Sequence, residues 1–137
     1  MRITTFTFAG LLTGALLFSS CNKYPDGPGF SMLSKKDRME GEWDLQETDH
    51  ADGTVTYDTS ADIMKLTDDM ECIYQSGVIT ITGSWEFAEK KEKVRILVSG
   101  YFSKLYSIRR LKSKELWLMD DSNSDVLKFK NREKDDN

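Results

Sequence analysis

The chain has 137 residues, and its 19 basic and 23 acidic side chains give a formal net charge of −4. This length is enough for one domain with a substantial core, and 39% of the residues are hydrophobic. The acidic balance argues against a nucleic acid as the partner, because phosphate backbones attract basic proteins.

The first twenty residues have the pattern of a secretory signal. Arg2 gives a positive start, an apolar run with small residues covers 6–18, and Ser19-Ser20-Cys21 follows. The run is too short to span a bilayer comfortably. A buried N-terminal helix is the alternative, but no charge interrupts the run and Cys21 closes it. We therefore expect residues 1–20 to direct export.

The same segment resembles a bacterial lipoprotein signal. Phe18-Ser19-Ser20-Cys21 would be the lipobox, although Phe18 is bulkier than the usual leucine. The resemblance implies that Cys21 becomes the mature N-terminus and carries two or three acyl chains. Each buried methylene contributes about 0.8 kcal/mol, so these chains would hold the protein on a membrane. Cys72 then has no cysteine partner, and its strand-like surroundings favour a buried, inert thiol.

A tether and a short helix are expected before the domain. Two prolines and two glycines between Asn22 and Gly29 favour turns and extended chain, so we interpret residues 21–33 as a spacer. Ser34 is a good N-cap with an acid, Asp37, three residues on, and helix formers follow up to Gly41. One or two helical turns there would close one end of a domain that covers 34–131. Residues 132–137 would form a polar tail.

From Gly41 onward the dominant period is two, which is typical of strands with one polar side. The sets expected to share a face are Trp43, Leu45 and Glu47; Ile79, Ile81, Gly83, Trp85 and Phe87; Val94, Ile96 and Val98; and Leu127 and Phe129. Turn-forming residues separate these runs at 49–53, 58–61, 67–70, 76–77, 89–93, 99–100, 112–114 and 120–125. The pattern predicts an all-β domain, a small up-and-down antiparallel barrel of eight or nine strands. A two-sheet sandwich is the alternative.

One stretch of sequence is written twice, as GEWDLQE from Gly41 and as GSWEFAE from Gly83. In each copy the glycine lies two residues before a tryptophan, Trp43 or Trp85, so both share a face. Glycine allows a sharp bend or a close neighbour, and the tryptophan can plug the barrel by burying about 200 Å². Packing alone explains the repeat. The alternative is a ligand site lined by Trp43, Trp85, Phe87 and Tyr106.

Gly41 and Trp43, after a short helix and before a meander of strands, resemble the first lipocalin motif. A closer resemblance, to short lipocalin-like lipoproteins of Gram-negative envelopes, covers nearly the whole mature chain; its residues are Cys21 to Pro28, Ser34 to Arg38, the paired Gly-x-Trp, Tyr106 to Ile108 and Glu115 to Leu118. The resemblance implies a lipocalin-like barrel. This chain is shorter than a true lipocalin, so its barrel would be shallower and could hold one small ligand or be filled by side chains. In many lipocalins a basic residue crosses the first-strand tryptophan, for which Lys128, Lys130 and Arg132 are candidates.

No catalytic or metal-binding arrangement stands out. Asp49, His50 and Asp52 could offer metal ligands, but a polar hairpin loop explains them better. Residues 121–125 have calcium-loop spacing, yet Val126 and Arg132 stand where that loop needs glycine and glutamate. The basic stretch 101–114 is interpreted as a hairpin with a basic outer face, and not as an anionic-lipid or nucleic-acid patch. We therefore predict neither catalytic residues nor a cofactor.

Both faces of the strand at 116–119 are apolar. If the even positions fill the barrel, Trp117 and Met119 face outward. They would then lie under the N-terminal helix or form a contact patch for a protein partner.

The functional hypothesis is a lipid-anchored envelope protein with a non-enzymatic binding or scaffold barrel, which in one version holds a small hydrophobic ligand. The alternative is a protein-interaction module with a filled core, which uses the barrel exterior to bind an envelope complex or to inhibit a protease. A hydrolase that uses His50 or the acidic loops is a third hypothesis. The tether carries no acidic run beyond Asp26, so we favour the periplasmic face of the outer membrane over the cell surface.

Overall fold

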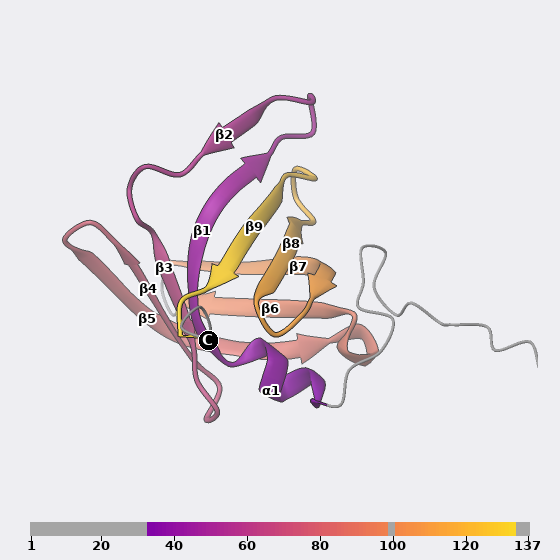
Figure 1. The fold of residues 1–137 in the computed structure, drawn as a ribbon. Helices are drawn as coiled ribbons and strands as arrows, with labels where there is room; N and C mark the ends of the chain where they lie inside the picture. The colour runs from indigo at the N-terminus through magenta and orange to yellow at the C-terminus, as the bar shows by residue number, and fades with distance from the viewer. Residues whose placement is uncertain (1–32, 99–100, 134–137) are drawn as a thin grey trace, which may run out of the picture.

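The computed structural model of the chain describes residues 33–98 and 101–133. These ranges contain one short α-helix, one turn of 3-10 helix and nine strands (Figure 1). The elements are α1 (Lys35–Met39), β1 (Gly41–Asp49), β2 (Val55–Tyr57), β3 (Ile63–Leu66), β4 (Glu71–Ser76), β5 (Ile79–Ala88), η1 (Glu89–Lys91), β6 (Lys93–Val98), β7 (Phe102–Leu111), β8 (Glu115–Asp120) and β9 (Val126–Asn131).

Several predictions concern residues outside these ranges. They are the export signal at 1–20, the lipidated Cys21, nearly all of the tether, the turn at 99–100 and most of the C-terminal tail. Within the described ranges, no helix has the length and hydropathy needed to cross a bilayer.

The strands form one antiparallel meander that closes on itself. Neighbours in the sheet run β2-β1-β3-β4-β5-β6-β7-β8-β9, and an additional pairing of β1 with β9 completes the circle. β2 pairs with β1 outside that circle, so the barrel has eight strands and one extra. The predicted up-and-down barrel is confirmed, and the sandwich is wrong. Closure satisfies the backbone groups that the first and last strands of an open sheet would expose.

β1 curves strongly and pairs with three other strands. Residues Gly41–Asp44 pair with β3, Glu47–Asp49 pair with β2, and β9 lies along the other edge. The register with β9 shifts between Leu45 and Glu47, which marks a β-bulge. A bulge adds a residue and reverses the faces beyond it. The predicted shared face of Trp43, Leu45 and Glu47 is therefore wrong at Glu47, whose carboxylate accepts from Lys128 Nζ at 2.8 Å outside the barrel.

The other predicted alternations agree with the observed burial. Trp85, Val94, Ile96, Val98 and Phe129 are buried, while the residues between them on these strands are partly or fully exposed. One cluster of buried side chains forms the core of the barrel: Met39, Trp43, Met64, Leu66, Cys72, Trp85, Val94, Ile96, Ile108, Leu111, Leu116, Leu118 and Phe129.

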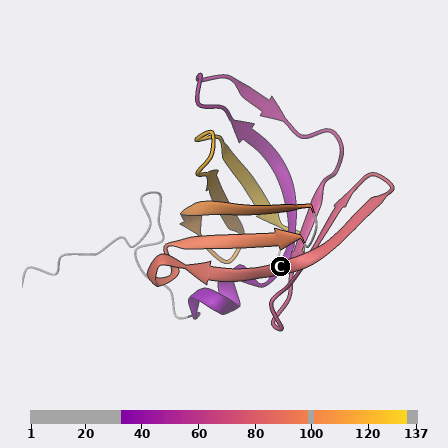
Figure 2. The same cartoon turned by 180° about the vertical axis from the view of Figure 1, so that it is seen from behind.

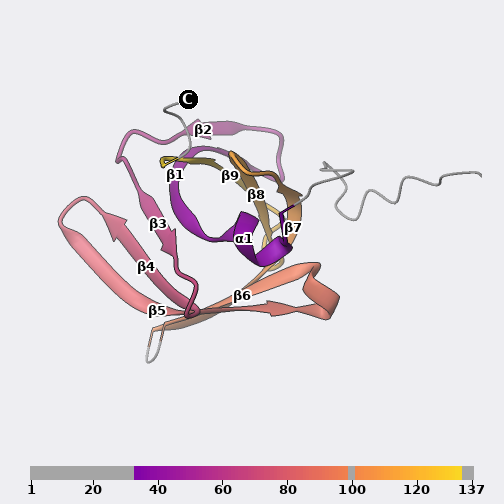
Figure 3. The ribbon, with the colours of Figure 1, turned by 60° about the horizontal axis from the view of Figure 1, so that its bottom comes forward.

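The predicted helix closes one end of the barrel (Figure 3). Ser34 and Asp37 form a capping box, in which the Ser34 hydroxyl accepts from the Asp37 backbone N–H and the Asp37 carboxylate accepts from that of Ser34. Met39 is fully buried, and its carbonyl accepts a 2.9 Å hydrogen bond from Trp43 Nε1. This end, which we name the closed end, is thus sealed by α1 and the first tryptophan.

The opposite end, which we name the open end, flares. The hairpin of β4 and β5 projects beyond β6 (Figure 2), because β5 pairs with β6 only from Ser84 to Ala88 in the described residues. Apolar side chains stand in solvent there: Val78, Ile79, Tyr101 and Phe102.

Candidate functional site

The open end contains a cavity of about 260 Å³ inside the barrel, which we name the cup. Its walls come from seven strands: Met64, Cys72, Tyr74, Ile81, Ile96, Val98, Phe102, Lys104, Tyr106, Leu118, Leu127 and Phe129. The cup occupies the half of the barrel away from α1. Leu116 of β8 is packed at the closed end, for example, and Leu118, two residues on, lines the cup.

Strand alternation builds the cup. Successive inward positions lie two residues apart, so each strand that supplies one buried side chain to the closed end supplies another to the cup. Large side chains, above all Trp43 and Trp85, fill the closed end of the barrel. On β5 the inward positions beyond Trp85 are Gly83 and Ile81, which leave room. One end of the barrel is therefore packed and the other is hollow.

An ion pair with one buried partner lies beside the apolar wall. Lys104 Nζ is 2.6 Å from the Asp120 carboxylate, which is only 5% exposed. The other Asp120 oxygen accepts from the backbone N–H and the hydroxyl of Ser122. Burial acts to raise the pKa of Asp120, but hydrogen bonds from Lys104 and Ser122 outweigh it and lower that pKa. Asp120 is therefore an anion at neutral pH, and the Lys104 ammonium lines the cup.

The remaining polar groups of the cup stay protonated. Tyr74 donates its phenol proton to Asp62 Oδ2 at 2.6 Å, and burial together with this contact raises the pKa of Tyr74. Burial, with a contribution from Asp120, raises the pKa of Tyr106 to about 12. Burial raises the pKa of the Cys72 thiol to about 11. None of the three is activated as a nucleophile, which agrees with the prediction of an inert Cys72.

The residues proposed from sequence as ligand contacts separate into two groups. Tyr106 lines the cup. Trp43 and Trp85 are fully buried at the closed end, and Phe87 packs edge-on against Trp85 with ring centroids 5.4 Å apart. Trp85 Nε1 donates to the Thr67 carbonyl at 3.1 Å, so both indoles are satisfied by the protein itself. The arrangement is the one expected for packing.

The two repeated glycines, Gly41 and Gly83, are needed for different reasons. Gly41 has φ +140°, a conformation that disfavours side chains, and a Cβ there would lie 2.6 Å from Asn131 Nδ2. A Cβ on Gly83 would overlap the backbone oxygen of Leu97, where β5 begins to leave β6. Each glycine thus permits a close approach beside the tryptophan that follows it.

Lys104 and Asp120 were not identified from the sequence as site residues. Both belong to alternating strands, Lys104 between the inward Phe102 and Tyr106, and Asp120 after the inward Leu118. A charged residue at an inward position of an apolar strand face is unusual. This signal could have identified Lys104 and Asp120 as site residues.

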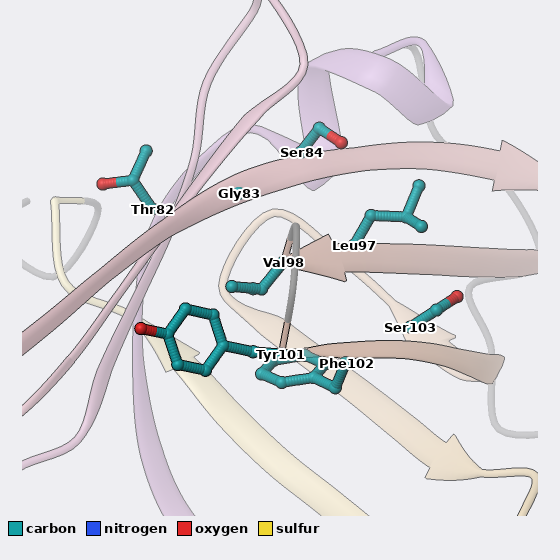
Figure 4. Close-up of a pocket in the computed structure, with 8 residues that line it drawn as sticks. All are labelled: Thr82, Gly83, Ser84, Leu97, Val98, Tyr101, Phe102 and Ser103. Carbon is teal, nitrogen blue, oxygen red and sulfur yellow. The ribbon is translucent and has the colours of Figure 1, made fainter.

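A second, shallower groove of about 530 Å³ lies on the rim where β5 bends away from β6 (Figure 4). It is lined by Thr82, Gly83, Ser84, Leu97, Val98, Tyr101, Phe102 and Ser103. It is wide open to solvent and lacks charged groups, so it offers less to a small ligand than the cup does.

Trp117 and Met119 face outward, as predicted, and are half-buried. Of the two predictions, cover by the N-terminal helix does not apply to Trp117. The indole is stacked between the Arg110 guanidinium, 3.9 Å from the ring centroid, and Lys128 Nζ at 4.8 Å. The helix lies elsewhere, with Arg38 Nη1 donating to the Leu111 carbonyl at 2.9 Å. Lys128 therefore covers Trp117 and does not cross the first-strand Trp43.

The polar loops are tied together by ordinary hydrogen bonds. His50 Nδ1 lies 2.9 Å from Asp125 Oδ2, and its Nε2 lies 2.7 Å from the Thr56 hydroxyl. Asp125 also accepts from the Ala51 backbone N–H. In the described part of the chain no three His, Cys, Asp or Glu side chains gather in a way that could hold a metal ion. The loops at 49–53 and 120–125 thus brace each other at the end of the β1–β9 pair.

Comparison with known proteins identifies the type of fold. No protein-family model and no curated protein matches the chain. Among solved structures, the chain is similar to a lipocalin-like protein from Bacteroides uniformis, with a TM-score of 0.61 and 16% sequence identity over 69% of this chain and 98% of that one. At this identity the likeness establishes the fold alone. The barrel is lipocalin-like, as the Gly-x-Trp pattern predicted.

Proposed function

We propose that this protein is a non-enzymatic binding module that holds one small, mostly apolar ligand in the cup. The observation that carries the proposal is the cavity of about 260 Å³, walled by aliphatic and aromatic side chains, in a barrel whose other end is packed. A lipocalin-like fold supports a binding or scaffold role over catalysis. The raised pKa values of Cys72 and Tyr106 point the same way, because activated nucleophiles have lowered ones.

The size of the cup limits the ligand. Drug-sized ligands need about 300–1,000 Å³, so this cavity is small. At about 30 Å³ for each water-sized group, it accommodates about nine non-hydrogen atoms. Lys104 and Asp120 form a neutral pair and Tyr106 is protonated, so the cup presents apolar surface with a few hydrogen-bonding groups. A short-chain amphiphile with an uncharged or singly charged head fits this chemistry.

Octan-1-ol is a suitable probe, since it has nine non-hydrogen atoms and one hydroxyl. We expect saturation-transfer NMR to detect its binding to the parent chain. Leu127→Phe, which adds volume to the cup, should weaken binding by about tenfold, equal to about 1.4 kcal/mol. Val126→Phe is the matched control, because the adjacent residue on β9 lies opposite Met119 and Asp49 outside the barrel.

Failure of octanol to bind, or equal weakening by both phenylalanine variants, would contradict the cup as the site. Native mass spectrometry of the protein purified from its own cells gives a second measurement. A retained small molecule that Leu127→Phe loses and Val126→Phe keeps would identify the natural ligand class.

We propose that a lipid on Cys21 anchors this module to a bacterial outer membrane, on the periplasmic face. The support is the apolar run at 6–18 followed by Ser19-Ser20-Cys21, which resembles a lipobox. Cys21→Ser should move the protein from the membrane to the soluble fraction. Mass spectrometry of the mature N-terminal peptide should show an acylated Cys21. Labelling of whole cells should fail until the outer membrane is made permeable, and labelling of intact cells would contradict the periplasmic face.

The outer face around Trp117 supports a second candidate, a protein-interaction module. The indole is held between two cations above a groove of about 490 Å³ whose lining includes Glu47 and Glu115. An aromatic side chain held in one orientation binds with little loss of entropy. Trp117→Ala should then lose a specific envelope partner in a pull-down with the lipidated protein, while Leu127→Phe keeps it. Unchanged partners would count against this face.

A further inference from the structure

Among the residues that the structure describes, one strand edge at the open end of the barrel has no neighbouring strand. β5 is paired with β4 from Ile79, opposite Ser76, to Ser84, opposite Glu71. On its other side β6 begins only at Ser84, and among the described residues nothing pairs with 79–82 on that side. The edge borders the groove of Figure 4 at Thr82 and Gly83.

The backbone groups on this edge can be assigned. The Trp85 backbone N–H donates to the Met70 carbonyl on the β4 side at 2.9 Å. In an antiparallel pair, the N–H and C=O groups of successive residues point to alternate sides. Odd-numbered residues of β5 therefore face β4. The backbone groups of Thr80 and Thr82 face away from it, toward the open edge, and a further strand could pair with them.

The composition of the β4–β5 hairpin favours pairing with a further strand, and residues that protect sheet edges are missing from it. Residues 72–85 contain no charged side chain, in a chain of which 31% is charged. Natural edges are commonly protected by lysine, proline or a bulge, and none of these lies in 78–82. At the tip, Val78 is fully exposed and Ile79 is 60% exposed. Ile79 also shares a groove with Tyr101, so the apolar surface extends to the neighbouring hairpin.

We propose that this edge pairs with the same edge of a second copy of the chain, antiparallel and centred on Thr80. The register follows from the ends of the free segment. Beyond Val78 the hairpin turns at Gly77. From Ser84 the edge is paired with β6, and the Leu97 backbone oxygen already lies against Gly83, so the five residues 78–82 match the same five of another copy. Thr80 then lies opposite Thr80, Ile79 opposite Ile81, and Val78 opposite Thr82.

The neutrality of the hairpin favours a second copy over a different partner. In a two-fold interface, each residue near the axis meets its own equivalent, so any charge there would meet itself. Every cross-strand pair in this register is between β-branched residues, which stabilise antiparallel pairs. Ile81 also lines the cup, so the second copy would extend the cup wall where β5 leaves β6. The pairing itself does not depend on the proposed ligand.

The test compares two charges placed on one hairpin. Thr80→Lys puts two ammonium groups at the axis. Gln75→Lys is the matched control, because Gln75 is the cross-strand neighbour of Thr80 on the same face, but β4 is paired on both sides. We expect native mass spectrometry of the full chain in detergent to show concentration-dependent dimers for the parent and Gln75→Lys. Thr80→Lys should raise the dimer dissociation constant at least about tenfold through like-charge repulsion.

Cysteine cross-linking tests the register without the risk of a folding defect from charge. Hydrogen-bonded antiparallel neighbours have Cα atoms about 5.5 Å apart, within reach of a disulfide. Thr80→Cys should therefore form a covalent dimer under mild oxidation, and Gln75→Cys and the parent should not. A parent that stays monomeric at all concentrations would overturn the proposal. So would a Thr80→Lys variant that dimerises as the parent does, and a different strand would then be the occupant to seek.

Discussion

The two ends of this barrel are built from the same strands and differ in almost every physical property. At the closed end, α1, Met39, Trp43 and Trp85 exclude water, and the carbonyls of Met39 and Thr67 accept hydrogen bonds from the two indole N–H groups. At the open end the strands flare, apolar side chains reach solvent, and a cavity remains. The comparison teaches that a small barrel can concentrate its stability at one end and leave the other free to bind. Matched substitutions at the two ends, and further substitutions at the open end, test this difference.

The largest difference is expected between two leucines on neighbouring strands. Leu116 is fully buried at the closed end, and Leu127 is partly buried at the cup. Leu116→Ala should lower the free energy of unfolding by about 3 kcal/mol, since it leaves a cavity in packed surroundings. Leu127→Ala should cost about 1 kcal/mol, because the space beside this side chain is already a cavity. Urea unfolding measures both, and equal losses would remove the distinction between the ends.

The glycines offer a second, smaller comparison. Gly83→Ala should lower the free energy of unfolding by about 2–3 kcal/mol, because its Cβ overlaps the Leu97 backbone oxygen and β5 or β6 must shift. Gly77→Ala, at the tip of the open hairpin, meets no atom within 4 Å and carries only the cost of its φ of +57°, about 1 kcal/mol. Thermal or urea unfolding of both variants checks the order. A harmless Gly83→Ala would show that β5 and β6 can separate easily at the bend.

The smallest effect is a pH dependence at the open end. The folded-state pKa of Asp120 lies below its ordinary value of 3.8. A lowered carboxyl pKa stabilises the fold at pH values above 3.8, and this contribution is lost as pH falls below 3.8 toward the folded-state pKa. Asp120→Asn should therefore reduce the acid-induced loss of stability, by at most about 1 kcal/mol. Urea midpoints measured from pH 6 to pH 2 check it, and Lys104→Met should act in the same direction.

Most of the fold could be predicted from the sequence, because the alternation of apolar and polar residues and the positions of turn-forming residues are local features. The N-cap at Ser34, the buried Trp85 and the inward set on β6 follow from residue spacing alone. The pattern failed at Glu47, because a bulge is decided by how β1 curves between β2, β3 and β9. It also left open what covers Trp117, since Arg110 and Lys128 meet it from two different strands.

The site was less predictable than the fold. Tyr106 was proposed together with three aromatic residues that pack at the closed end, because period-two spacing shows which face a residue occupies and not how far along the barrel it lies. Lys104 and Asp120 are 16 residues apart in sequence, and their contact depends on β7 and β8 lying side by side. The cup itself is a volume that side chains from seven strands leave unfilled.

The sequence by itself determined the strand order, the capped helix, the inward faces and the two glycine–tryptophan elements, because each depends on contacts between residues close in the chain. The tertiary structure alone decided which end is packed, where β5 leaves β6, and how much space remains inside. Those properties depend on how eight strands twist around one shared interior. The sequence of a single strand does not specify that combined arrangement.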